Sequence, residues 1–305
     1  MATNDASIDG RDWSLLGLLS ILWGGSFFFN GVILRELPPL TLVLLRVALA
    51  ALMLLPLLWI YRIRFPKGVS GWRPFLAIGL FNNVLPFSLI VMGQTYIASG
   101  LASILNATTP LFTLVVMAAA GEEKLHARRI AGVVAGLIGV AILHGESFDK
   151  GFGFETGPGI GILLCLAAAF SYGLSALVAR RLLSNSPPLG TATFQMLASA
   201  AMMLPVAGVV ERPWQLPIPG AATWLAVVGL AVMSTALAYI VFFQILWRSG
   251  ATNVMLVTLL IPVTAILLGY LVLGESISPR EIAGALVIGS ALLLIDGRAL
   301  NFFRR

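Results

Sequence analysis

Long uncharged apolar stretches are the feature that most limits how this chain can fold. Residues 15–34 are one example, with twenty consecutive positions free of Lys, Arg, Asp and Glu. A stretch of this length is typical of a helix that crosses a bilayer. Only 10% of the chain is charged, whereas a soluble domain carries about 25%. The sequence therefore predicts a polytopic membrane protein of the all-α class, because a lone segment in lipid must satisfy its own backbone.

The apolar stretches divide the chain into ten predicted transmembrane helices. At roughly 20 residues each, ten helices use about 200 residues, which leaves short links and no separate soluble domain. The predicted spans are 14–34, 40–61, 73–93, 98–120, 129–144, 158–180, 188–210, 221–246, 252–273 and 280–296. The fifth and tenth are short for a bilayer, but their matching positions in the two halves support both. We interpret the first as a retained helix rather than a signal peptide, because it is long and many spans follow it.

The distribution of Lys and Arg predicts the orientation of these helices. With the N-terminus inside, 14 of the 19 basic residues fall in inner links and tails, four fall in outer links, and Arg46 lies within the second span. Basic residues concentrate on the cytoplasmic side of membrane proteins, so we expect both termini in the cytoplasm. The net charge of +6 reflects this topology, and no basic patch indicates a nucleic-acid partner.

Two similar links reveal an internal repeat. Residues 121–132 read GEEKLHARRIAG and residues 274–284 read GESISPREIAG. A shift of about 150 residues also places Pro38-Pro39-Leu40 on Pro187-Pro188-Leu189, Gln94 on Gln244 and Pro110 on Pro262. Each copy holds five helices, and since five is odd the second copy enters the membrane from the opposite side. Inverted repeats of this kind recur in secondary transporters, which hold their substrate near the midplane between the halves.

The repeat sets the predicted domain organisation. The order is a cytoplasmic N-terminal tail (1–13), a first five-helix repeat (14–145), an external linker (146–157), a second five-helix repeat (158–297) and a cytoplasmic basic tail (298–305). Two copies of one unit that face opposite ways can exchange conformations, so outward-open and inward-open states have similar energies.

Several of these residues resemble a known family. The motif Trp-Gly-Gly-Ser at 23–26, Pro-Pro at 38–39, Arg46, the prolines of the fourth and ninth spans and the two Gly-Glu…Ile-Ala-Gly links are similar to those of the drug/metabolite transporter superfamily, in its ten-helix EamA-type branch. The resemblance covers nearly the whole chain. It implies export of metabolites from the cytoplasm through a cavity between the halves, and the chain looks most like amino-acid exporters, aromatic amino-acid exporters included. It also implies a bacterial inner-membrane location.

Ionisable side chains are nearly absent from the predicted spans. No Asp or Glu lies in mid-span, and a proton-coupled carrier usually needs a buried carboxylate or a His relay, so we expect uniport-like transport. Arg46 is the exception. It lies roughly 9 Å into its helix at about 1.5 Å per residue, where it could bind a substrate carboxylate through two parallel hydrogen bonds. The alternatives are snorkelling or a structural bond to a nearby carbonyl. The second half has Gln195 in its place, so any role need not be symmetric.

Uncharged polar and aromatic side chains lie near the middle of several spans. In lipid the polar groups among them need partners, and as a belt they favour a wet central cavity. For any single residue the alternative is a hydrogen bond that joins two helices. Together with Arg46, the predicted substrate-binding residues are Trp23, Asn82, Asn83, Phe87, Asn106, Tyr172, Ser234 and Thr258.

Four functions compete for this sequence. The first is a carrier that exports small metabolites, most of all amino acids, by alternating access. The second is an efflux carrier of the same fold for drugs or lipid-like amphiphiles, and the third is a passive channel. An intramembrane enzyme is disfavoured, because no nucleophile–base pair, paired aspartates or His cluster lies in mid-span. We expect no catalytic residue, metal or cofactor. The expected partners are a small-molecule substrate and lipid, and both a monomer and a dimer fit the sequence.

Overall fold

The computed structural model describes residues 10–123, 126–143, 157–184, 186–242, 244–245 and 257–296, and all regular structure in those residues is helical. Seven of the helices are long and apolar enough to cross a membrane, and two shorter apolar helices accompany them. The predicted C-terminal tail at 298–305 lies outside the described residues. So does the predicted linker at 146–157, except for Gly157, which is the first residue of a helix. The part of the predicted N-terminal tail that is described, from Gly10 on, belongs to the first helix.

The helical elements follow the predicted spans closely. In the first half they are α1 (Gly10–Ile33), α2 (Pro39–Ile60), α3 (Gly68–Gly79), η1 (Leu80–Val84), α4 (Leu85–Gly93), α5 (Ser99–Asn106), α6 (Thr109–Ala119) and α7 (Ala127–Leu143). In the second half they are α9 (Gly157–Leu182), α10 (Pro188–Val210), η2 (Pro213–Gln215), α11 (Ala221–Ala231), η3 (Val232–Leu237), α13 (Val257–Leu268), η4 (Gly269–Leu273) and α14 (Pro279–Asp296).

The second helix of each half begins in the same way. Pro39 opens α2 and Pro188 opens α10, each after another proline. Proline suits the first helical position because its missing N–H would have no partner there and its φ is already helical. Both starts follow from the repeated Pro-Pro-Leu sequence.

The third helix of each half contains a π-helical segment that the sequence did not predict. In the first half η1 lies between α3 and α4, and in the second η3 follows α11 within the continuous helix Ala221–Phe242. A π segment inserts an extra residue into the helical turn and often marks a functional site. The fourth span is interrupted instead, because α5 ends at Asn106 and α6 begins at Thr109, whereas Pro262 lies inside α13 without a break.

Unusual backbone conformations occur at matching places in the two halves. Arg62 and Arg212, 150 residues apart, each follow the second helix of their half with φ of 53° and 50°. Gly121 and Gly274 stand in the repeated Gly-Glu links with φ of 74° and 71°. Left-handed φ is uncommon outside glycine, so this agreement shows that the repeat extends to the backbone.

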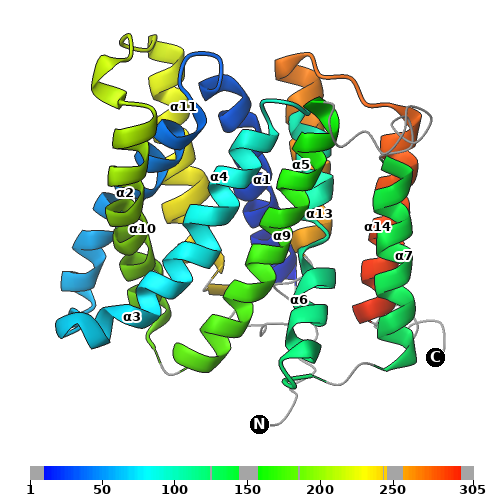
Figure 1. Ribbon diagram of the computed structural model, residues 1–305, viewed down its shortest axis with the longest axis horizontal. Helices are drawn as coiled ribbons and strands as arrows, with labels where there is room; N and C mark the ends of the chain where they lie inside the picture. Colours follow the sequence, from blue (N-terminus) through cyan, green and yellow to red (C-terminus); the bar gives the residue numbers. More distant parts are fainter. Residues whose placement is uncertain are drawn as a thin grey trace.

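The two halves are interleaved rather than side by side. We call α1, α11, η3 and α13 the α1 group, because α1 packs against the other three. We call α4, α5, α6 and α9 the α9 group for the same reason. Thus each half's first helix packs among helices of the other half, while α2 packs on α10 and α7 on α14. In Figure 1, α1 runs from the lower to the upper end of the view and α9 runs the opposite way.

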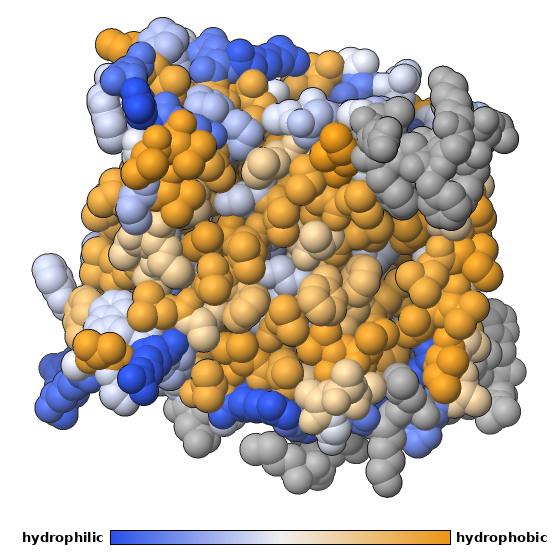
Figure 2. All heavy atoms as spheres, in the orientation of Figure 1, coloured by the Kyte–Doolittle hydropathy of each residue, from blue (hydrophilic) through white to orange (hydrophobic). Residues whose placement is uncertain are grey.

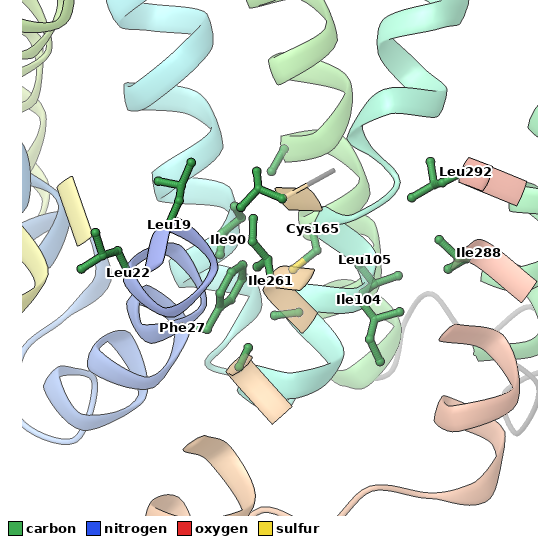
Figure 3. Close-up of a cluster of buried hydrophobic side chains, with 14 of the residues drawn as sticks. Leu19, Leu22, Phe27, Ile90, Ile104, Leu105, Cys165, Ile261, Ile288 and Leu292 are labelled. Carbon is green, nitrogen blue, oxygen red and sulfur yellow. The ribbon is translucent and has the colours of Figure 1, made fainter. Parts of the chain in front are cut away.

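The largest core cluster lies where the two groups meet. Figure 3 shows Leu19 and Phe27 of α1 near Ile90, Cys165 and Ile261, which come from α4, α9 and α13, with Leu22 on the other side of α1. Ile288 and Leu292 of α14 close this cluster on one side. On the visible face, Figure 2 shows an apolar band across the middle of the molecule and hydrophilic residues toward both ends, as expected of a protein surrounded by lipid.

Candidate substrate site

Arg46 is a buried cation in the first half of α2. Only 7% of the residue is exposed. Its Nε donates a hydrogen bond to Thr235 Oγ1 in η3 over 3.1 Å, and its guanidinium carbon lies 3.7 Å from the centroid of the Phe87 ring in α4. Thr235 Oγ1 in turn donates to the Leu230 carbonyl over 2.9 Å. A guanidinium stacked on an aromatic face and bonded at Nε is held in one orientation.

Within the described residues, Arg46 forms its hydrogen bond through Nε, to Thr235. Its two terminal nitrogens form no hydrogen bond to these residues. The ion pairs among the described residues lie elsewhere, where Glu122 and Glu123 meet arginines. Tyr172 and Tyr239 lie close to Arg46. Because a buried charge is costly without a partner, this guanidinium is suited to bind an anionic group from a ligand.

Asn82 is the centre of a polar cluster beside Arg46. Its Nδ2 donates to Gln195 Oε1 over 3.2 Å and to the Tyr239 hydroxyl over 3.1 Å, and its Oδ1 accepts from Ser175 Oγ over 3.1 Å. The four residues come from η1, α10, α9 and the helix that follows η3. One amide therefore joins four helices, and the cluster is only partly buried at Asn82.

Asn83 accepts a long hydrogen bond from Asn82 Nδ2 over 3.5 Å, but its own amide nitrogen is directed into the packing of α10. It is fully buried, and its Nδ2 donates to Ser199 Oγ over 3.0 Å. Ser199 Oγ also lies within bonding distance of the Gln195 and Gly79 carbonyls, at 2.6 and 3.2 Å. This arrangement is the interhelical bond that the sequence left open as the alternative for each polar residue.

The other predicted residues lie at separate places. Trp23 stacks against Phe242, with ring centroids 5.6 Å apart, and packs on the same core cluster as Tyr172. Asn106 is the last residue of α5, and Ser234 lies in η3 with 1% of the residue exposed. The Oδ1 atom of Asn106 and the Oγ atom of Ser234 are both buried, and neither has a hydrogen-bond partner among the described residues. Thr258 lies half-buried at the start of α13.

The structure thus brings Arg46, Phe87, Asn82 and Tyr172 together, with Asn83 next to them but directed into the helix packing. Asn82 contacts Gln195, Tyr239 and Ser175 directly, and the wet cavity expected from the sequence stays a prediction. The sequence missed Tyr239, Ser175 and Ser199 as members. Their spacing in the sequence could have indicated Tyr239 and Ser199, because each lies four residues, about one helical turn, after another member of the site: Tyr239 after Thr235, and Ser199 after Gln195. Among the described residues, no group of three or more His, Cys, Asp or Glu side chains could hold a metal ion.

Comparison with known families places both halves of the chain in one group. The EamA-like transporter family matches residues 12–144 and again residues 159–296. The two matches meet near the boundary between α7 and α9.

Individual relatives match over most of their length. The uncharacterized transporter YoaV of Bacillus subtilis is 25% identical, over 95% of this chain and 98% of its own. A probable amino-acid metabolite efflux pump of Salmonella typhimurium is 26% identical over 93% and 94%, respectively. A crystal structure with 21% identity superimposes with a TM-score of 0.65 over 94% of this chain and 96% of the other, which shows the same fold.

Proposed function

The chain belongs to the EamA-like transporter family, and we propose that it exports amino acids, aromatic and hydrophobic ones included, from the cytoplasm by alternating access. It is a multi-pass membrane protein of the bacterial inner-membrane type. Relatives named as probable amino-acid metabolite efflux pumps support the substrate class. All the relatives named here are transporters, which argues against an enzyme.

The proposed topology is ten transmembrane helices in two inverted five-helix repeats, with both termini in the cytoplasm. The matching left-handed residues Arg62 and Arg212, and Gly121 and Gly274, support the repeat. The opposite directions of α1 and α9 support the inversion (Figure 1). With the basic residues of the links on the cytoplasmic side, the upper end in Figure 1 faces outward.

Arg46 is the observation that carries the proposed substrate class. Its Nε is bonded to Thr235 and its face is covered by Phe87, while its two terminal nitrogens point to no acceptor among the described residues. Two parallel N–H donors match the geometry of a carboxylate. An amino acid carries that carboxylate and stays neutral overall, so it can pair with Arg46 without bringing net charge into the membrane.

The same cation disfavours the alternative of cationic drug efflux, because a positively charged amphiphile would meet an unneutralised guanidinium. The predicted site residues Trp23, Asn82, Asn106, Tyr172, Ser234 and Thr258 would then line the path of the side chain and amino group. The orphan oxygens of Asn106 and Ser234 are free acceptors within the described residues, as an ammonium group requires.

Counterflow in proteoliposomes tests the proposal. Vesicles loaded with unlabelled phenylalanine should accumulate labelled phenylalanine from outside, and a pH gradient of either sign should leave the rate unchanged, as uniport requires. Phenylalanine should be displaced by other hydrophobic amino acids, but phenethylamine, which lacks the carboxylate, should compete poorly. Equal competition by phenethylamine would rule out recognition through Arg46 and favour amphiphile efflux, and a strong dependence on the pH gradient would rule out uniport.

A further inference from the structure

The link between η4 and α14 places a carboxylate on the first turn of α5. Glu275 accepts hydrogen bonds from the backbone N–H of Ser99 over 2.9 Å and of Gly100 over 3.3 Å. The start of a helix has unpaired N–H groups and a partial positive charge, so a carboxylate there is strongly favoured. Glu275 belongs to the second half of the chain and α5 to the first.

The glycine before Glu275 explains how it reaches α5. Gly274 adopts a left-handed conformation, and the Glu275 N–H donates back to the Gly269 carbonyl over 3.1 Å. A side chain at Gly269 would collide with the Glu275 carboxylate. The Gly-Glu sequence therefore ends the helix and folds the carboxylate back toward its neighbour.

Three amide and hydroxyl side chains continue this contact toward α1. Gln94, just after α4, accepts a hydrogen bond from Asn30 Nδ2 over 2.8 Å and donates through Nε2 to the Phe27 carbonyl and to Ser99 Oγ, both over 3.0 Å. We call Asn30, Gln94, Ser99 and Glu275 the upper lock. The upper end of the molecule is where α1 and α4 end and α5 begins (Figure 1), and the upper lock lies at these helix ends.

The upper lock joins the two groups of helices. Gln94 directly follows α4 and Ser99 begins α5, both of the α9 group. Asn30 lies in α1, and Glu275 follows α13 and η4, on the side of the α1 group. Two other carboxylates bound at helix starts on this end, Glu36 and Glu211, do not join these groups. Glu36 accepts from Gly220 N–H at the start of α11, and Glu211 accepts from Leu40 and Thr41 at the start of α2.

Two counterparts of the upper lock lie in the described part of the lower end. Glu122, which like Glu275 follows the left-handed glycine of its link, pairs with Arg180 and Arg181 of α9. The repeat mate of Asn30 is Ala179, which cannot donate a side-chain hydrogen bond. The segment that corresponds to the start of α5, residues 249–250, lies outside the described residues.

Because these contacts join the α1 group to the α9 group at the outward end, we propose that the upper lock is the outer gate, and that Asn30, Gln94, Ser99 and Glu275 must separate before substrate leaves the cell. The proposal rests on the proposed function for its orientation and for what passes the gate. The α1 group and the α9 group move apart at the upper end when the lock breaks, and the carboxylate of Glu275 is the strongest single contact, because its hydrogen bonds are charge-assisted.

A distance measurement tests the gate without requiring transport. Spin labels are attached at Arg35→Cys, which follows α1, and at Thr95→Cys, which follows α4; both positions are exposed. The background variant is Cys165→Ala, which removes the one native thiol. Pulsed electron spin resonance then reports the separation in liposomes. Glu275→Gln removes the charge of the lock and should raise the ratio of long to short distances by about tenfold, within the range of couplings between conformations.

Glu281→Gln is the matched control. Glu281 lies in the same region and carries the same charge, but its carboxylate accepts from the Ser278 N–H at the start of its own helix. It should leave the distances as in the unmodified protein. Gln94→Met removes the amide part of the lock with little change of shape and should act in the same direction as Glu275→Gln, so it decides the matter if Glu275→Gln fails to fold.

Unchanged distances in both lock variants, or an equal opening in Glu281→Gln, would overturn the gate. The proposed function fails separately. If the unmodified protein moves no amino acid while the lock variants still open, the substrate assignment is wrong and the gate stands. If amino acids are transported but the distances do not change, the gate is wrong and the function stands.

Discussion

Arg46 and Gln195 occupy the same place in the second helix of the two halves, and each contacts the π-helical segment of the other half. Arg46 Nε donates to Thr235 Oγ1 in η3 over 3.1 Å, and Gln195 Oε1 accepts from Asn82 Nδ2 in η1 over 3.2 Å. The contact is symmetric, but only one side carries a charge. A symmetric scaffold therefore presents an asymmetric site, as is needed to bind a substrate with one carboxylate.

Replacing Arg46 tests whether its terminal nitrogens bind substrate. Arg46→Lys keeps the charge but loses the planar pair of donors, and hydrogen bonds to charged groups contribute about 1.5–3 kcal/mol. We expect the apparent KM for phenylalanine in counterflow to rise by roughly 10- to 150-fold, at about 1.4 kcal/mol per tenfold. Arg46→Gln, which copies the second half, should lose transport. A KM close to that of the unmodified protein in both variants would assign Arg46 to structure.

Phe87→Leu separates the orientation of Arg46 from its charge. Leucine keeps the apolar volume but removes the ring face that lies 3.7 Å from the guanidinium. A buried cation–π contact is worth about 2 kcal/mol, so Arg46 would sample other orientations, and KM should rise less than in Arg46→Lys. Phe75→Leu is a control, because Phe75 packs against Phe194 in a different cluster. An equal effect of both changes on transport would contradict the role given to Phe87.

The two adjacent asparagines should respond differently to alanine. Asn83 is fully buried and bonded to Ser199, and interhelical hydrogen bonds in membranes contribute about 0.6–1.7 kcal/mol, so Asn83→Ala should lower stability and leave KM nearly unchanged. Asn82 is partly buried beside Arg46 and should change transport more than stability. The measurements are thermal unfolding in detergent and counterflow. A transport defect in Asn83→Ala without loss of stability would reverse this assignment.

Much of the fold follows from the sequence because its causes are local. Apolar length and the Pro-Pro starts at Pro39 and Pro188 place the helices, and the Gly-Glu links locate two left-handed turns. The π segments could not be predicted, because η1 and η3 depend on how helices from the other half pack against them. For the same reason the sequence selected Asn82 and Asn83 together, although Asn82 bonds to side chains of three other helices and Asn83 donates to Ser199 of α10.

The wet centre shows another limit of sequence reasoning. A belt of polar residues is compatible with a cavity or with interhelical bonds, and the choice depends on the distances between helices. In the described structure Asn82, Gln195 and Tyr239 are close enough to bond directly. The three residues lie in η1, in α10 and in the helix after η3, so hydration of this cluster requires these helices to move apart, and composition alone does not fix that distance.

The crossing of α4 and α9 gives a last prediction, on stability. Gly93 and Gly161 face each other there, and a side chain at Gly161 would come within 3.0 Å of the Gly93 carbonyl oxygen and 2.9 Å of Ile97. Gly161→Leu should force the helices apart and destabilise the protein by about 1–3 kcal/mol. Gly289→Leu is the control, since nothing lies within 4 Å of a side chain at that position. Cys165 reports the result directly, because this buried thiol should react with a fluorogenic maleimide only on unfolding. The melting temperature in that assay should fall for Gly161→Leu and stay unchanged for Gly289→Leu, and a fall of equal size in both would mean that close approach of α4 and α9 is not what the glycine provides.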